Sequence, residues 1–246
     1  MKRIFLLTVT ILISIGLSAR TFVLVIGVSN YGSESNNLRQ TTKDAKAFKK
    51  VMESQTKDIT LLTSKYANKA NILEKLRAIC NRAGKDDRIV FFFSGHGMSG
   101  GICAYDGVIY YTELIALLTS SDAQYKIAYI DACHAGTIFG GTPTKEQQGL
   151  NALLNVAKEK KDQIFFVGCR GGEYSLESAW VGAGYFSQAL IKGLRGKCDR
   201  NGDRHITVLE LFKYIYNDVV KRSLSKQHPQ LIVSQALQEA VIATWN

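Results

Sequence analysis

Residues 88–97, RIVFFFSGHG, form an apolar run that ends on a histidine standing between two glycines. A continuous run of β-branched and aromatic residues is typical of a strand buried on both faces, as in parallel sheets. In such sheets the binding crevice lies beyond the carboxyl ends of the strands. His96 follows that end directly, and Gly95 and Gly97 permit a sharp turn and close approach of a substrate. The stretch therefore predicts a functional rim at His96; the alternative is a histidine in a surface turn.

Similar apolar runs recur along the chain, at 22–32, 58–63, 126–132, 163–169 and 230–235. Segments with helical spacing of apolar residues separate them, at 38–52, 72–79 and 114–118. Strands alternating with helices predict an α/β fold whose mostly parallel sheet carries helices on both faces. The chain has 246 residues and no linker rich in Pro, Gly and Ser, so we expect one domain, at 20–246.

The first 19 residues differ in composition from the rest. Lys2 and Arg3 precede a mostly apolar, uncharged stretch at 4–17, and Ser18 and Ala19 are small residues suited to a signal peptidase. The pattern predicts a secretory signal at 1–19 and an exported protein, periplasmic or secreted. The alternative is an uncleaved anchor, but the apolar stretch is shorter than the roughly 18–20 residues that a span needs, so we expect no stable membrane span.

The chain is basic, with 31 Lys and Arg against 21 Asp and Glu and a net charge of +10. Removal of the leader takes away only two cations, so the mature chain stays basic. Its lysines are scattered over helical patterns without interleaved aromatic residues or a nucleic-acid motif. We therefore expect no nucleic-acid partner.

The five cysteines include no C-x-x-C pair, and an odd number leaves at least one thiol unpaired in an exported protein. Cys80 and Cys169 end apolar patterns and are expected to be small buried hydrophobes. Cys133 differs, because in KIAYIDACHAG (126–136) it follows a strand end, as His96 does. An imidazole close to a thiol lowers its pKa or protonates a departing amine. The pair predicts acyl transfer at one rim of the sheet.

At this point the chain resembles the caspase-like cysteine peptidases, most closely their metacaspase branch. The resemblance rests on FVLVIGVSNYG, NNLRQTTKDAKAF, FFFSGHG, YIDACHAG, VGCRGGEYSLES, GYFSQALIKGL and QHPQ, which follow the family's order over nearly all of the mature chain. It implies a caspase-like fold with a six-stranded sheet, five strands of it parallel. It also implies a dyad of His96 and Cys133, an oxyanion hole at the amides of Gly97 and Cys133, and a monomer, as is usual for metacaspases.

The residue two places before the nucleophile is glutamine in caspases, whereas here it is Asp131, as in metacaspases. The resemblance also implies substrate contacts from Asp44 and Ser94. Two carboxylates and a hydroxyl in one pocket favour Arg or Lys before the scissile bond. The alternative is that Asp131 caps a turn and that Asp44 lies on a helix surface.

We expect no cofactor and do not expect calcium to be required. Many metacaspases bind calcium through acidic loops after the histidine and the cysteine, but the corresponding loops here contain few acids. A weaker metal candidate resembles an EF-hand loop and comprises Asp199, Asn201, Asp203 and Glu210, with Arg204 in the place of the usual glycine. Its alternative is a polar turn before a helix. His134 beside Cys133 suggests a rival base or a zinc ligand, but the sequence offers no set of three or four zinc ligands.

These observations together predict an exported cysteine endopeptidase that acts on peptides or proteins with Arg or Lys before the scissile bond. The segment TPTKEQQG, with Lys145, and the segment AKEKK at 157–161 are candidate sites of self-processing. The alternative function is a catalytically silent caspase-like module that binds partners.

Overall fold

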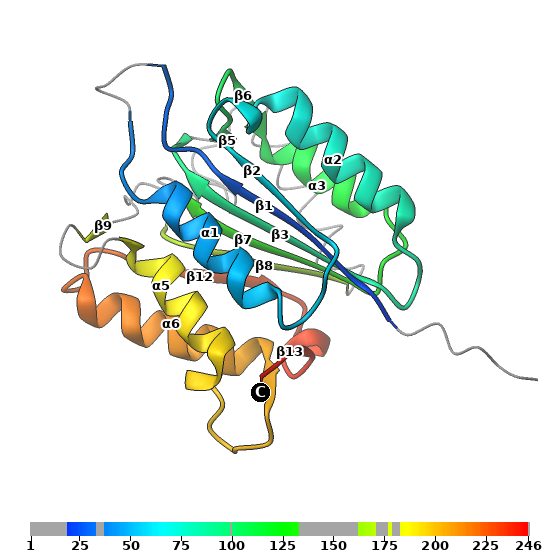
Figure 1. The fold of residues 1–246 in the computed structure, drawn as a ribbon. Coiled ribbons are helices and arrows are strands. Elements are labelled where there is room, and N and C mark those ends of the chain that lie inside the picture. The colour runs from blue at the N-terminus through cyan, green and yellow to red at the C-terminus, as the bar shows by residue number, and fades with distance from the viewer. Residues whose placement is uncertain are drawn as a thin grey trace, which may run out of the picture.

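The computed structural model describes residues 19–32, 37–98, 100–132, 162–170, 177–178 and 183–245. Its centre is a six-stranded sheet in the order β12-β8-β7-β3-β1-β2 (Figure 1). The strands are β1 (Thr21–Gly27), β2 (Ile59–Thr63), β3 (Arg88–Gly95), β7 (Tyr125–Ala132), β8 (Gln163–Val167) and β12 (Gln230–Val233). Only β12 runs antiparallel to its neighbour. The predicted fold class, with five parallel strands of six, is confirmed.

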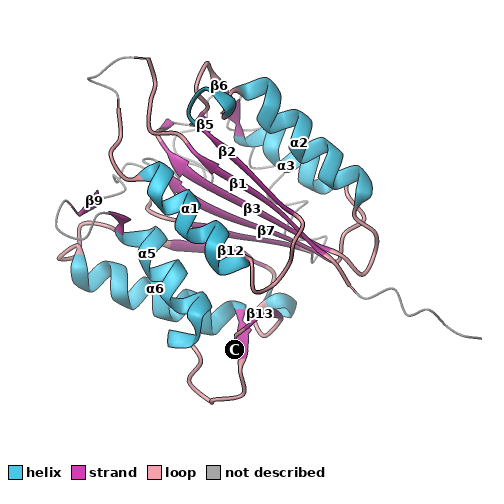
Figure 2. Cartoon of the chain, in the orientation of Figure 1, coloured by secondary structure: helices cyan, strands magenta, loops and turns pink. Residues whose placement is uncertain are grey.

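Helices cover both faces of the sheet (Figure 2). One face packs against α1 (Thr41–Met52), α5 (Tyr185–Lys192) and α6 (Val208–Arg222), and the other against α2 (Lys69–Arg82) and α3 (Tyr111–Thr119). Strand β3 shows why its sequence is apolar throughout. Phe92 lies in the core beneath α1, whereas Phe91 and Phe93 lie in the core beneath α2 and α3. A strand buried on both faces has no solvent side on which polar residues could alternate.

Several short elements decorate this framework. A three-stranded sheet comprises β4 (Gly97–Met98), β5 (Gly101–Cys103) and β6 (Val108–Tyr110), while β9 (Glu177–Ser178) pairs with β10 (Ala183–Gly184) and β11 (His205–Thr207) with β13 (Val241–Thr244). Short helical turns are η2 (Ser64–Tyr66), η4 (Gly193–Lys197) and η5 (Gln235–Leu237). The helical pattern predicted from residue 38 begins later, at Thr41, where the Asp44 amide donates to the carbonyl of the N-cap Gln40 at 2.9 Å. Leu38 lies outside the helix and donates its amide to the Ser29 carbonyl at 2.8 Å.

The predicted leader lies almost wholly outside the described residues. Within the described part of the chain, no helix has the length and apolar character that a bilayer crossing requires.

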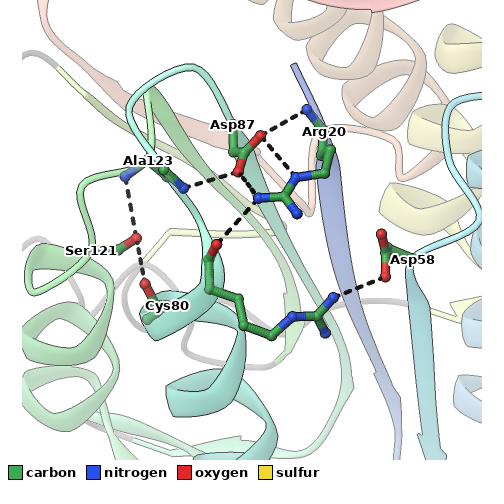
Figure 3. A network of polar contacts seen from close by, with 8 residues as sticks. Arg20, Asp58, Cys80, Asp87, Ser121 and Ala123 are labelled. Carbon is green, nitrogen blue, oxygen red and sulfur yellow. Dashed lines mark hydrogen bonds and ion pairs between the residues drawn. The ribbon is translucent and has the colours of Figure 1, made fainter. Parts of the chain in front are cut away.

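Arg20 and Asp87 join the amino-terminal ends of β1 and β3 (Figure 3). The Arg20 amide donates to Asp87 Oδ1 at 2.8 Å, and Nη2 of the Arg20 side chain lies 2.8 Å from Asp87 Oδ2. The Gly84 amide donates to the same carboxylate at 2.9 Å. The hydrogen bond from the Arg20 side chain and the two backbone amides outweigh the effect of burial and lower the pKa of Asp87 to about 2.

We expect Asp87→Asn to lower the free energy of unfolding at neutral pH by about 1–2 kcal/mol, since the half-exposed guanidinium is partly screened by water. The unfolded carboxyl titrates near pH 4. A lowered folded pKa therefore stabilises the protein above about pH 4, and this contribution is lost as the pH falls toward 2. Denaturant titrations from pH 7 to 2 should show the two proteins converging in acid. The exposed neighbour offers a control, because Asp86→Asn should change little at any pH.

Candidate active site

The carboxyl ends of β1, β3 and β7 form one rim. The strand register places Ser94 beside Gly27 on one side and beside Asp131 on the other. The next pair is Gly95 with Ala132. The backbone segments that lead into His96 and into Cys133 are therefore neighbours, as the sequence predicted.

His96 lies half-buried between the end of β3 and the start of β4 at Gly97. Its amide donates to the hydroxyl of Tyr31 at 2.7 Å, and its carbonyl accepts from the Cys103 amide at 2.9 Å. The backbone on both sides of the imidazole is therefore tied to other elements. Cys133, the partner predicted for His96, and the adjacent His134 lie outside the described residues.

Asp44 and Asp131 approach the amino terminus of α5 from two different elements. Asp44 comes from α1 and is 2% exposed, and Asp131 comes from β7 and is 5% exposed. The Gly184 amide donates to Asp44 Oδ2 at 3.1 Å. Asp131 Oδ2 accepts from the Ser187 amide at 3.1 Å and from its hydroxyl at 2.6 Å. Helix amides and a hydroxyl thus compensate for burying two carboxylates in one place.

Two glycines allow this convergence. A Cβ on Gly27 would lie 2.6 Å from Ala45 Cβ and 2.7 Å from the Thr41 carbonyl, so the missing side chain lets α1 approach the sheet. A Cβ on Gly184 would lie 2.7 Å from Asp131 Oδ2 and 3.5 Å from Asp44 Oδ2. Both carboxylates therefore meet above the same glycine. This contact contradicts the alternative in which Asp44 occupies a helix surface.

Ser94, the third residue predicted for the pocket, is 2% exposed. It has the same parity along β3 as Phe92, and Asp131 has the same parity along β7 as Tyr129, so both face the side covered by α1 and α5. The structure thus places Asp44, Ser94 and Asp131 on one side of the rim.

Two of the other cysteines are poor nucleophiles. Burial raises the pKa of Cys80 to about 11 and that of Cys198 to about 12, and a thiol must ionise to react. Cys169 is also fully buried, which confirms the prediction for Cys80 and Cys169. The described cysteines Cys80, Cys103, Cys169 and Cys198 form no disulfide.

Comparison with known proteins identifies the family. The model of the caspase domain, a peptidase family, matches residues 20–241. The chain belongs to the caspase-domain family. The resemblance noted in the sequence is thereby confirmed.

Two curated relatives and one solved structure place this caspase domain further. It is 26% identical to Metacaspase-1B of Aspergillus clavatus over 204 residues, which cover 71% of this chain and 50% of the relative. It is 28% identical to Metacaspase-1A of Aspergillus terreus over 202 residues, covering 69% and 49%. The chain thus spans about half the length of these relatives. A crystal structure of a Geobacter sulfurreducens protein matches with a TM-score of 0.66 at 17% identity, covering 92% of this chain and all of that one, and supports the fold.

In the candidate metal loop of this caspase domain, the polar side chains form hydrogen bonds with the backbone of the loop itself. Asp199 accepts from the amides of Gly202 and Arg204, at 2.8 and 3.0 Å. Glu210 accepts from the Thr207 amide at 3.1 Å and so caps α6. Arg204 adopts φ 64°, a left-handed conformation that suits glycine. In the described part of the chain, no group of three or more His, Cys, Asp or Glu residues has the arrangement of a metal site.

Gly184, Ser187 and Tyr31 contact the predicted site residues, and sequence reasoning missed them. All three lie in segments that resemble the family, namely GYFSQALIKGL and FVLVIGVSNYG, but no charge or spacing distinguishes them there. Only the packing of α5 against β7, and of the loop after β1 against β3, reveals what they contact.

Gly184→Ala is expected to lower kcat/KM for peptide hydrolysis by about tenfold. The added methyl group would force Asp131 aside, and such overpacking costs about 1–3 kcal/mol. Gly184 has φ −64°, so alanine introduces no backbone strain there. Gly107→Ala is the matched control, because a Cβ at Gly107 meets nothing within 4 Å. Equal activity of the two variants would contradict the role assigned to Gly184.

Proposed function

We propose that this caspase domain is an exported cysteine endopeptidase that cleaves after Arg or Lys. One observation carries the proposal: the buried carboxylates of Asp44 and Asp131 converge on Gly184 at the rim that bears His96. A buried pair of carboxylates at the mouth of a peptidase site favours a cationic substrate side chain. Arginine would bind through a fork of hydrogen bonds and lysine as a point charge.

The proposed reaction is thiol-dependent acyl transfer. The thiolate of Cys133 attacks the carbonyl carbon of the scissile bond, and the amides of Gly97 and Cys133 stabilise the resulting oxyanion. His96 then gives its proton to the departing amine, which leaves a thioester on Cys133. Next, His96 takes a proton from water, whose oxygen attacks the thioester. The carbon–sulfur bond breaks, the carboxylic acid product departs and loses its proton to solvent, and Cys133 and His96 return to the thiolate and imidazolium forms.

We also propose that the enzyme cleaves itself after a basic residue beyond Cys133, with Lys145 as the first candidate and 157–161 offering others. Residues 157–161, AKEKK, contain several lysines, which match the substrate preference proposed above. All of these residues lie outside the described part of the chain.

Intact mass after incubation tests activity, specificity and processing in one experiment. Wild-type protein should yield two fragments whose masses identify a basic residue at the cut, and Cys133→Ala should stay whole. An electrophilic peptide ending in Arg should label wild type at Cys133. Wild type that neither labels nor cleaves any Arg or Lys peptide would contradict the proposal and leave the silent binding module, which no observation on the described residues favours.

Export is proposed with the leader removed after Ala19. The backbone nitrogen of Arg20, the residue after the proposed cut, lies 2.8 Å from Asp87 Oδ1. Cleavage there would turn this amide into an ammonium group and strengthen the contact with the carboxylate. Amino-terminal sequencing of protein from the cell envelope or medium should begin at Arg20; retention of residues 1–19 would contradict the proposal.

We propose that activity does not require calcium. The side chains of Asp199 and Glu210 already accept hydrogen bonds from backbone amides, so a metal would have to compete with those bonds. Activity should therefore survive a calcium chelator. An increase of tenfold or more in millimolar calcium would contradict this proposal and implicate Asp199, Asn201, Asp203 and Glu210, each of which can then be replaced by alanine.

A monomer is proposed, as the likeness to metacaspases implies. Light scattering coupled to gel filtration should give the mass of one chain at micromolar concentration, and a mass of two chains would contradict it.

A further inference from the structure

Tyr31 lies in the loop after β1, and its side chain reaches the turn that carries His96. Its hydroxyl accepts from the His96 amide at 2.7 Å and donates to the Cys103 carbonyl at 3.2 Å. The Cys103 amide donates back to the His96 carbonyl at 2.9 Å. One hydroxyl thus links the two strands of the β4–β5 hairpin at its open end, where His96 precedes β4.

Gly95 makes this approach possible. A Cβ at position 95 would lie 2.7 Å from the Tyr31 hydroxyl and 2.7 Å from Phe93 Cζ. The glycine before the histidine therefore provides room for the tyrosine. The aromatic ring also contacts the imidazole, since the two ring centroids are 4.7 Å apart and the rings are tilted by 45°.

The loop that carries Tyr31 is itself held in place. The Tyr31 amide donates to Asn37 Oδ1 at 2.9 Å, and the Gly32 amide donates to Asn30 Oδ1 at 2.8 Å. The Leu38 amide also donates to the Ser29 carbonyl, two residues before Tyr31. The hydroxyl is thus presented to His96 from a backbone with several independent attachments.

We propose that Tyr31 is a positioning residue for His96. Its hydroxyl fixes the backbone of the histidine, and its ring restricts the orientation of the imidazole. A tyrosine suits this place because one hydroxyl accepts from an amide and donates to a carbonyl at the same time. The proposal rests on the acid/base role proposed for His96.

A positioning role predicts a particular kinetic pattern. Misplacing a catalytic group by about 1 Å can cost about a hundredfold in rate. Tyr31→Phe keeps the ring but removes the hydroxyl, so we expect kcat to fall by about 10–100-fold while KM changes by less than about threefold. Tyr31→Leu removes the ring contact as well and should lower kcat further.

The test combines kinetics with alkylation of the active-site thiol. Cys133 is followed by peptide mapping as iodoacetamide reacts at pH 5 to 10, in wild type, in Tyr31→Phe and in the exposed control Tyr66→Phe. An oriented imidazole holds the alkylation midpoint below the value of about 8.5 for an ordinary thiol. The midpoint should move upward in Tyr31→Phe and stay in place in Tyr66→Phe.

The outcomes separate this proposal from the proposed function. If His96→Ala is inactive while Tyr31→Phe keeps the kcat and alkylation midpoint of wild type, the role of Tyr31 is wrong and the dyad stands. If His96→Ala is fully active, the dyad itself is wrong. A drop in Tm of more than about 10 °C in Tyr31→Phe, or an equal loss of kcat in Tyr66→Phe, would contradict positioning and indicate a structural role.

Discussion

Cys133→Ala is expected to abolish hydrolysis of Arg and Lys peptides, with a loss of at least about a thousandfold. Without the thiol no thioester forms, and the remaining groups can only orient a substrate. His96→Ala should lower kcat by about 10²–10⁴-fold, because the departing amine then leaves unprotonated. His134→Ala should retain much of the activity, since the resemblance to metacaspases implies His96, and not His134, as the partner of Cys133. Steady-state kinetics on one Arg peptide measure all three.

Cys80→Ala and His205→Ala are suitable controls for these variants. Cys80 is buried on α2 and its pKa is raised, and the exposed side chain of His205 contacts the backbone of its own loop, so neither is expected to affect kcat at a temperature below Tm. Full activity of His96→Ala, or loss of activity in Cys80→Ala without unfolding, would overturn the assignment of the dyad.

Asp131→Asn should lower kcat/KM for Arg peptides by at least about 30-fold. Removing one partner of a buried charge pair typically costs about 2–5 kcal/mol. Asp44→Asn should act similarly, because its carboxylate approaches the same glycine. The neutral Gln side chain of a matched peptide forms no ion pair with the carboxylate, so kcat/KM for that peptide should fall much less. Peptides matched except for a final Arg, Lys, Gln or Asp provide the measurement.

The exposed residue Asp122 provides the control, and Asp122→Asn should leave every substrate unaffected. If Asp131→Asn lowers kcat/KM equally for the Arg and the Gln peptides, the aspartate serves only to hold Ser187 and α5. A preference of wild type for Asp peptides would likewise remove the basis for the proposed specificity.

Much of the fold was predictable because β3 and its parallel neighbours are buried on both faces. A run such as residues 89–93 is apolar throughout and has no face that could be exposed to solvent. Its place in a sheet covered on both sides therefore follows from its composition. The short pairs β4–β5 and β11–β13 were not predictable. Segments of two to four residues carry too little periodicity, and their pairing depends on contacts made far along the chain.

The candidate site divides in the same way. His96, Asp44 and Asp131 stand out in sequence because they are polar groups beside apolar runs or within a recognisable family pattern. Gly184 and Ser187 do not, since their importance lies in the distance from the start of α5 to a carboxylate on β7. That distance depends on how α5 packs against the sheet. The spacing of residues along the sequence does not show this packing.

The interior position of β8 has a consequence for self-cleavage. β8 pairs with β7 on one side and with β12 on the other, so it is inside the sheet although it follows the proposed cut. Lys126, 1% exposed, binds Asp162 Oδ2 at 2.6 Å, and its amide donates to the Asp162 carbonyl at 2.8 Å. A nick after Lys145 would therefore produce a noncovalent heterodimer with a shared sheet. Its two pieces should migrate as one particle in native electrophoresis and separate only after denaturation.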